Sequence, residues 1–179
     1  MDLPDYPWFP PLERLYAGRR PIDPKRIRFQ GDVFDDVISY RFRANEGPPA
    51  ANPRSTRGPV MLLDHPCDIS EDEKGAQQPW RTICPVAEDR QGVLSLDGET
   101  YFYAFPLPDL RLDDSVWYAD FRFATTVHVD ILDPNSRLSA LSEEGWYALQ
   151  RRLAHHRTRV VIHWSDLLQA GEGDHPDAH

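Results

Sequence analysis

Residues 58–70 read GPVMLLDHPCDIS, and this stretch places four consecutive apolar residues, Val60 to Leu63, directly before a group of ionisable side chains. The apolar run is too short for a typical helix, and it is bounded by Gly58-Pro59 on one side and Pro66 on the other. Such a run is typical of a strand that is buried on both faces. We therefore predict that residues 60–63 form a central strand of a sheet.

Reactive side chains follow this predicted strand, in the turn where the chain leaves the core: Asp64, His65, Cys67 and Asp68. A rigid strand that delivers polar side chains to a loop is a common way to build a site. Cys67 would act as a nucleophile if His65 or the backbone amides of a turn lowered its pKa. The structural alternative is a thiol buried as a small apolar group, followed by an aspartate that accepts backbone hydrogen bonds. Both interpretations stay open at this point.

Metal ligands of suitable chemistry are also present, because transition metals bind the side-chain types of Asp64, His65 and Cys67. A further ligand would have to come from a distant residue such as His128 or Cys84, and nothing in the sequence brings either one to the turn. Two cysteines are too few for a zinc site made of cysteines alone. We therefore predict neither a metal nor a cofactor.

Length and charge limit the class of protein. The chain has 179 residues and a formal net charge of −9, and this length is enough for one domain with a sizeable core. Residues 61–120 contain 4 basic and 13 acidic side chains, so the net charge of this third, −9, equals that of the whole chain. Phosphate binding needs cations. A nucleic-acid surface is therefore disfavoured there, and only the arginine-rich N-terminal third has suitable charge.

Targeting signals are not evident in the sequence. No apolar run approaches the roughly 20 residues that span a bilayer, and the N-terminus lacks the basic and apolar regions of a signal peptide. We expect a cytoplasmic protein without membrane contact, and hence reduced thiols at Cys67 and Cys84.

Three regions differ in composition. Residues 1–29 combine many prolines with several aromatic residues. Proline disfavours regular structure and aromatic rings are costly to leave in water, so we expect an extended arm that lies across its own or a neighbouring subunit. One helical turn is expected near residues 11–17. Residues 30–169 should form the single folded domain, and residues 170–179 a disordered tail.

The folded domain is predicted to be mainly β, because most of it has the apolar patterns of short strands. In the first strand, Ile38, Tyr40 and Phe42 alternate with polar residues and should face the core. Residues 127–131 alternate in the same way near the end of the last strand. The predicted strands beyond residues 60–63 are 30–42, 80–86, one or two strands within 115–132, and a hairpin of 92–96 and 100–105 joined by Asp97-Gly98.

One amphipathic helix is predicted at residues 143–157. Ser142 is a suitable N-cap, and the two glutamates after it suit the positive end of a helix. Trp146, Leu149 and Leu153 form one apolar stripe at helical spacing. Several short strands followed by one helix favour a small, strongly curved β-barrel or half-barrel that the helix caps.

Four short motifs occur in an order that resembles the MazF/PemK toxins: Gly31-Asp32-Val33-Phe34, Thr56 to Leu63, Ile83-Cys84-Pro85-Val86, and Arg137 to Ser142 before the final helix. The resemblance covers roughly residues 30–157. It implies a small SH3-like barrel, commonly a homodimer, that cleaves single-stranded RNA and is neutralised by an antitoxin peptide.

The family's chemistry relies on an arginine in the loop before the second strand and a threonine after the third. The resemblance assigns the first role to Arg57, which would stabilise charge on a phosphate. The threonine position falls on Ala87, whose side chain has no proton to donate. The segment at residues 64–69 is not a toxin motif, and it is similar to a Ser-x-x-Cys-Asp-Ile segment in uncharacterised prokaryotic proteins related to this barrel.

Three hypotheses about function follow. The first is a catalytically degenerate barrel that serves as a protein-interaction module, in a toxin–antitoxin, phage or defence setting, and binds a partner or itself through the N-terminal arm or a groove. The second is an endoribonuclease that uses Arg57 and the loop from Asp64 to Asp68 on single-stranded RNA. The third is an enzyme with Cys67 as its nucleophile. Ala87 and the acidic middle third favour the first hypothesis over the second.

Overall fold

The apolar run at residues 60–63 lies in the core, as predicted. In the computed structural model, Val60, Met61 and Leu62 are fully buried and Leu63 is 5% exposed. The structure describes residues 9–41, 54–64, 79–90, 92, 94 and 102–158.

The described residues form an eight-stranded antiparallel sheet, two α-helices and three short 3-10 helices. The strands are β1 (Tyr16–Arg19), β2 (Val33–Arg41), β3 (Arg54–Leu62), β4 (Trp80–Glu88), β5 (Ala104–Pro108), β6 (Val116–Asp120), β7 (Thr125–His128) and β8 (Arg137–Leu141). The helices are α1 (Leu12–Leu15) and α3 (Glu143–Thr158), with 3-10 helices η1 (Phe121–Phe123), η2 (Val129–Ile131) and η3 (Pro134–Ser136). The strand order is β1-β8-β2-β3-β4-β6-β5, and β7 pairs with β4.

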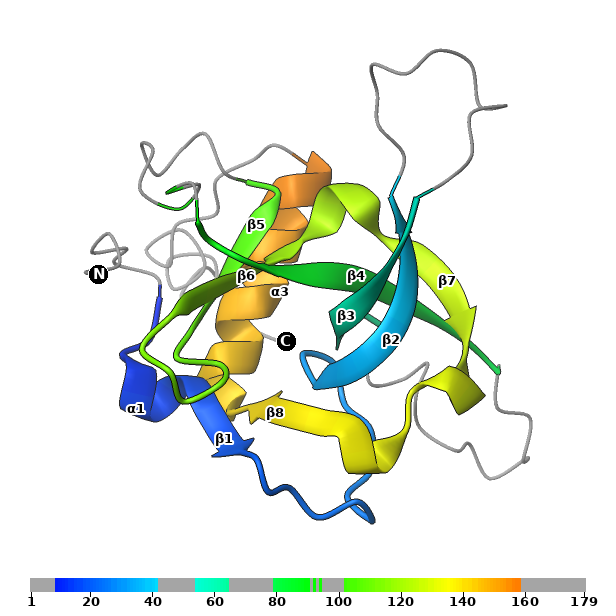
Figure 1. The fold of residues 1–179 in the computed structure, drawn as a ribbon. Coiled ribbons are helices and arrows are strands. Elements are labelled where there is room, and N and C mark those ends of the chain that lie inside the picture. Colours follow the sequence, from blue (N-terminus) through cyan, green and yellow to red (C-terminus); the bar gives the residue numbers. More distant parts are fainter. Residues whose placement is uncertain are drawn as a thin grey trace, which may run out of the picture.

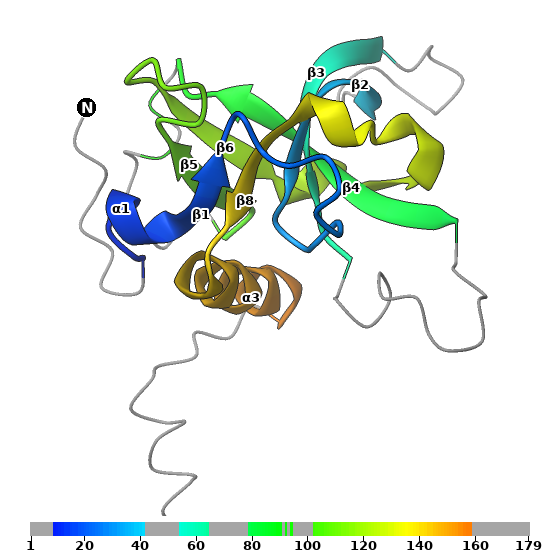
Figure 2. The same cartoon turned by 90° about the horizontal axis from the view of Figure 1, so that it is seen from below.

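A mainly β fold with one C-terminal helix is thus confirmed, and α3 packs across one face of the curled sheet (Figures 1 and 2). The prediction of a barrel is wrong in one respect, because the sheet is not closed. Among the described strands, no pairing joins β1 to β5 at the two ends of the order. Strand β4 pairs with β7 over Trp80–Ile83 and with β6 over Val86–Glu88. The sheet therefore divides along β4 instead of closing on itself.

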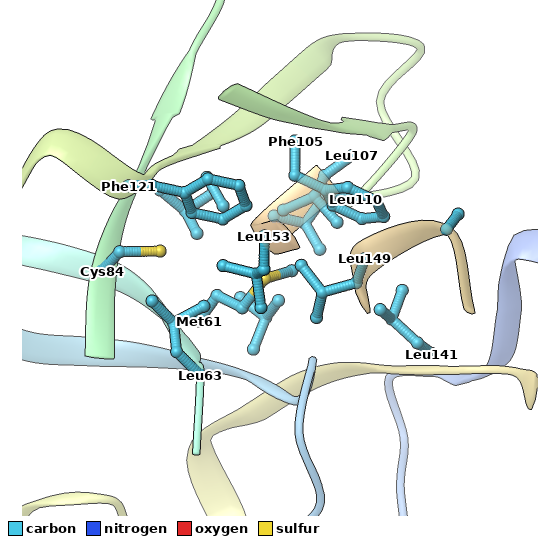
Figure 3. Close-up of a cluster of buried hydrophobic side chains, with 14 of the residues drawn as sticks. Met61, Leu63, Cys84, Phe105, Leu107, Leu110, Phe121, Leu141, Leu149 and Leu153 are labelled. Atoms are coloured by element: carbon cyan, nitrogen blue, oxygen red, sulfur yellow. The ribbon is translucent and has the colours of Figure 1, made fainter. Parts of the chain in front are cut away.

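Strand β3 separates two hydrophobic clusters, which explains why its apolar residues are continuous. Met61 and Leu63 belong to the cluster between the sheet and α3, together with Leu149 and Leu153 (Figure 3). Val60 and Leu62 belong to the cluster on the opposite face, with Phe34, Val37, Ile83 and Leu132. Successive side chains of a strand point to opposite faces, so a strand between two cores needs apolar residues at every position.

A β-bulge in β2 corrects the predicted direction of its side chains. The pairing with β3 shifts between Phe34 and Val37, and Asp36 in the bulge has a φ of 62°. The extra residue places Phe34 and Val37 in the same cluster. Beyond the bulge Ser39 is buried and Ile38 is 48% exposed, the reverse of the prediction. The side chain of Tyr40 and all of Phe42 lie outside the described residues.

Pro85 lies inside β4, a central strand, although proline cannot donate a ladder hydrogen bond. On one side of β4 it is opposite Val60 of β3. On the other side it falls between the part of β4 that pairs with β7, which ends at Ile83, and the part that pairs with β6, which begins at Val86. The missing N–H therefore coincides with the change of partner strand.

Two other predicted strands differ from the structure. Strand β5 pairs with β6, while the predicted turn at Asp97-Gly98 lies outside the described residues. Val129 to Ile131 form η2 instead of extending β7, and the Nδ1 atom of His128 accepts a hydrogen bond from the Asp130 N–H at its start. Local side-chain capping thus ends a strand that apolar alternation alone would continue.

The described part of the N-terminal arm is integrated with the rest of the chain. Residues 12–15 form the predicted helical turn, and Leu15 is fully buried in the core against α3. Strand β1 pairs with β8, and the ring of Phe9 lies 5.7 Å from that of Phe105. Residues 1–8 lie outside the described residues.

Helix α3 begins as predicted, with Ser142 as its cap. The Ser142 hydroxyl accepts a hydrogen bond from the Gly145 N–H at 3.0 Å and also donates to the Arg14 carbonyl. The Ser142 N–H donates to the Leu15 carbonyl at 2.9 Å. The helix is therefore capped and tied to α1 by the same residue. No helix in the described part of the chain is long and apolar enough to cross a membrane.

Gly31→Ala should lower the free energy of unfolding by about 2 kcal/mol or more. Gly31 has a φ of +89°, and a Cβ there would lie 2.4 Å from Cδ1 of Leu141. Gly58→Ala is the matched control, because nothing lies within 4 Å of a Cβ at that position; it should be neutral or slightly stabilising. Urea unfolding of both variants tests this, and equal losses would contradict it.

The buried Asp32–Arg137 pair predicts a pH-dependent stability. Both side chains are 1% exposed, with Oδ2 of Asp32 3.4 Å from Nε of Arg137. Burial raises the pKa of Asp32 from 3.8 to about 6, against the opposing effect of Arg137. The folded protein thus holds this proton more tightly than the unfolded chain. The resulting stabilisation is complete below pH 4 and is lost as the pH rises towards 6, by up to about 3 kcal/mol.

Unfolding free energies of the unmodified protein and of Asp32→Asn between pH 4 and pH 7 test this prediction. Their difference should change across that interval, because the amide does not titrate. Parallel pH profiles would show that Asp32 does not contribute to the pH dependence of the unfolding free energy. Glu13→Gln is the control, because it replaces an exposed carboxylate on α1 and leaves the Asp32–Arg137 pair intact.

Candidate functional site

An open pocket of about 350 Å³ lies at the end of β3, between the sheet and the C-terminal half of α3. Asp64 of the predicted reactive turn is one of its lining residues. The sheet side is formed by Gln30, Leu63, Asp64 and Thr82, and the helix side by Gln150, Leu153, Ala154 and Arg157. The stretch that sets the fold thus also delivers a charged side chain to a cavity.

Backbone hydrogen bonds hold the Asp64 carboxylate in place. Its two oxygens accept from the Thr82 N–H at 2.9 and 3.0 Å, and the Leu63 N–H donates to the Thr82 carbonyl at 2.9 Å. The chain therefore follows β4 for two residues after β3 ends. A carboxylate has more acceptor sites than one N–H occupies. Within the described residues Asp64 forms no ion pair, so it retains capacity to bind a further donor.

Gln30 forms the floor of the pocket and joins three elements. Its Nε2 donates to the Leu63 carbonyl at 2.6 Å, and its Oε1 accepts from Nε1 of Trp146 at 2.8 Å and from the amide of Gln150. The side chain is 3% exposed. Because buried amides need such partners, Gln30 fixes the position of α3 over the sheet.

Arg157 and Thr82 complete the polar lining. Arg157 is exposed on the last turn of α3, and Thr82 is half-buried on β4. The pocket therefore combines one anion, one cation and neutral hydrogen-bonding groups with the apolar wall of Leu153. Such a lining is suited to ion pairing and hydrogen bonding with a polar group. In the part of the chain that the structure describes, no three histidine, cysteine or acidic side chains converge to bind a metal.

An exposed aromatic pair lies on the sheet beside the pocket. Trp80 is 56% exposed and opposite His128 in the β4–β7 register, with their rings edge to face at 5.5 Å. Side chains two apart on a strand share a face. Trp80 and Thr82 therefore lie on the face of Cys84, which packs in the cluster beneath α3. Ile131, 44% exposed, follows His128 in the chain.

Arg57 lies in the first half of β3, on the N-terminal side of the apolar run. Its guanidinium forms a bidentate ion pair with Asp36 of the β2 bulge, through Nη2 at 2.8 Å and Nε at 2.5 Å, and both side chains are exposed. Asp64 is seven positions after Arg57, which at about 3.3 Å per residue of strand places them roughly 20 Å apart. The two predicted site residues that the structure describes are therefore not brought together.

The remaining predicted site residues, His65, Cys67 and Asp68, lie outside the described residues. Cys84 is fully buried, and burial raises the pKa of its thiol well above the usual value. This thiol therefore behaves as a small apolar group. Ala87 is half-buried on β4 opposite Tyr118, and its methyl group offers no hydrogen bond.

Sequence reasoning missed Gln30, Thr82, Gln150 and Arg157. They are separated by long stretches of chain, and none stands in a recognisable motif. Only the helical spacing of Gln150, Leu153 and Arg157 signals that these three residues share a face.

No family model matches the chain, and no curated protein matches it. The resemblance to the MazF/PemK toxins therefore stays a prediction.

Gln30→Ala should lower the free energy of unfolding by about 2–3 kcal/mol, because it leaves the buried Leu63 carbonyl and the Trp146 indole N–H without their partner. Gln150→Ala is the comparison, since it removes one donor from a partly exposed position and should cost roughly 1 kcal/mol. Urea unfolding of the two variants measures both losses. If Gln30→Ala loses no more unfolding free energy than Gln150→Ala, Gln30 does not fix the position of α3 over the sheet.

Proposed function

We propose that this chain is a catalytically degenerate, MazF/PemK-like binding module that recognises a protein partner. The observation that carries the proposal is the separation of Arg57 from Asp64 along β3. Groups that act on one scissile bond must lie within hydrogen-bonding reach of it. Arg57 is engaged by Asp36, and the pocket lies at the far end of the strand.

The order of the strands supports the MazF/PemK-like part of the proposal. The motifs that carry the resemblance fall on four neighbouring strands: Gly31-Asp32 leads into β2, Arg57 is in β3, Cys84-Pro85 is in β4, and Arg137 begins β8. Motifs that are distant in sequence thus lie side by side in the order β8-β2-β3-β4. The open edge of the sheet and Ala87 are departures from the toxin pattern.

The exposed surface beside the pocket supports a protein partner. Trp80 and His128 present aromatic surface two residues along β4 from Thr82 of the pocket lining. Tryptophan is enriched among the residues that contribute most to protein interfaces, which lie near the centre of an interface and are surrounded by a polar rim. The net charge of −9 disfavours RNA as the ligand of this face.

The N-terminal arm is the second contact region that we propose, for a partner or for self-association. Leu15 is in the core and β1 is part of the sheet. A deletion that tests the arm must therefore be confined to residues 1–8.

Trp80→Ala should abolish partner binding without unfolding the protein. The test is affinity capture with the unmodified chain, Trp80→Ala and Leu112→Ala as baits, in lysates of cells that carry its gene. Leu112 is the control because it is 58% exposed and lies in the β5–β6 connection. A protein retained by the unmodified and Leu112→Ala baits and lost from Trp80→Ala supports the proposal. Two results together would refute a binding role for this face. All three baits would capture the same proteins, and light scattering would give the same molar mass for the unmodified and the Trp80→Ala chains.

An RNA assay separates the alternative functions. Single-stranded RNA should stay intact with the unmodified protein and with Arg57→Ala. Cleavage that is lost in Arg57→Ala and kept in Arg90→Ala, an exposed arginine paired with Glu88, would replace the proposal with the endoribonuclease. Alkylation of Cys67 over a pH series tests the third hypothesis, which requires a thiol more reactive than an ordinary one.

A further inference from the structure

The Asp64 carboxylate is the inner charge of the pocket. It is half-buried and held by the Thr82 N–H, while Arg157 is exposed at the outer end of α3. No ion pair joins the two in the described structure, although they line the same cavity. An oppositely charged group that enters this pocket would therefore meet a fixed anion.

The walls between these charges suit a long aliphatic stem. Leu63, Leu153 and Ala154 line the pocket beside Asp64. Lysine and arginine bury their methylene groups along such apolar surfaces while their charged ends reach a polar partner. Trp80 lies on the same face of β4, two residues from Thr82. An indole ring attracts guanidinium and ammonium groups through its π-face.

Charge complementarity favours a basic partner over an acidic one. The whole chain has an excess of acidic side chains, with a formal net charge of −9. Such an excess attracts a cationic segment over long range and repels an anionic one.

We propose that the pocket at the end of β3 receives a lysine or arginine side chain from a basic segment of the partner protein, with Asp64 as its counter-ion. This assignment rests on the proposed function and names the chemistry of the partner. It predicts that neutralising Asp64 weakens binding more than neutralising an equally charged residue elsewhere.

Two Gly/Ser nonapeptides, one with a central arginine and one with a central norleucine, test the assignment by NMR titration of the full chain at low salt. The arginine peptide should shift the Thr82 amide and the Trp80 indole signals, and the norleucine peptide should not. Asp64→Asn should weaken the binding of the arginine peptide about tenfold. The amide oxygen of Asn still accepts from the Thr82 N–H, and thermal unfolding checks that this variant is folded.

Glu13→Gln is the matched control, because it removes one negative charge from an exposed position on α1. An equal loss of binding in Asp64→Asn and Glu13→Gln would overturn the assignment, since it would show long-range attraction only. A glutamate nonapeptide that shifts the same signals, with a loss in Arg157→Gln, would overturn it in favour of an acidic segment. If Trp80→Ala loses the captured partner and Asp64→Asn keeps it, the proposed function stands and the assignment of this pocket fails.

Discussion

Burial of β3 on both faces is the constraint on which the rest of the structure depends. Each of Val60, Met61, Leu62 and Leu63 contributes about 2 kcal/mol of apolar burial. Their alternation divides this contribution between the cluster under α3 and the cluster on the other face. A one-residue slip of β3 would exchange the two sets of side chains. The end of the strand, and with it Asp64, is therefore fixed in position.

The contacts around this end link the fold to the pocket. Gly31 donates its N–H to the Leu62 carbonyl at 2.8 Å and leaves room for Leu141. Gln30, the preceding residue, donates to Leu63 and accepts from two residues of α3. One turn before β2 thus ties the end of β3, the start of α3 and the floor of the pocket together. Its glycine and its amide are structural requirements for the same cavity.

Much of the fold was predictable because local signals agreed with burial. The continuous apolar run from Val60 to Leu63 indicated a strand buried on both faces. The N-cap Ser142, the two glutamates after it and the apolar stripe together predicted α3. Ile38 was wrongly expected to be buried, because a bulge at Asp36 changes the alternation and leaves no apolar pattern of its own. The end of β7 was also missed, because the cap formed by His128 outweighs the alternation of Val127, Val129 and Ile131.

The sequence by itself determined the mainly β class, the buried central strand, the C-terminal helix and the placement of Asp64 just beyond the core. These features depend on spacing and on residues close together in the chain. The tertiary structure alone decided that the sheet stays open, that Arg57 pairs with Asp36 far from Asp64, and that Gln30, Thr82, Gln150 and Arg157 surround the pocket. Such features arise from strand register and helix packing, which join residues that no local pattern connects.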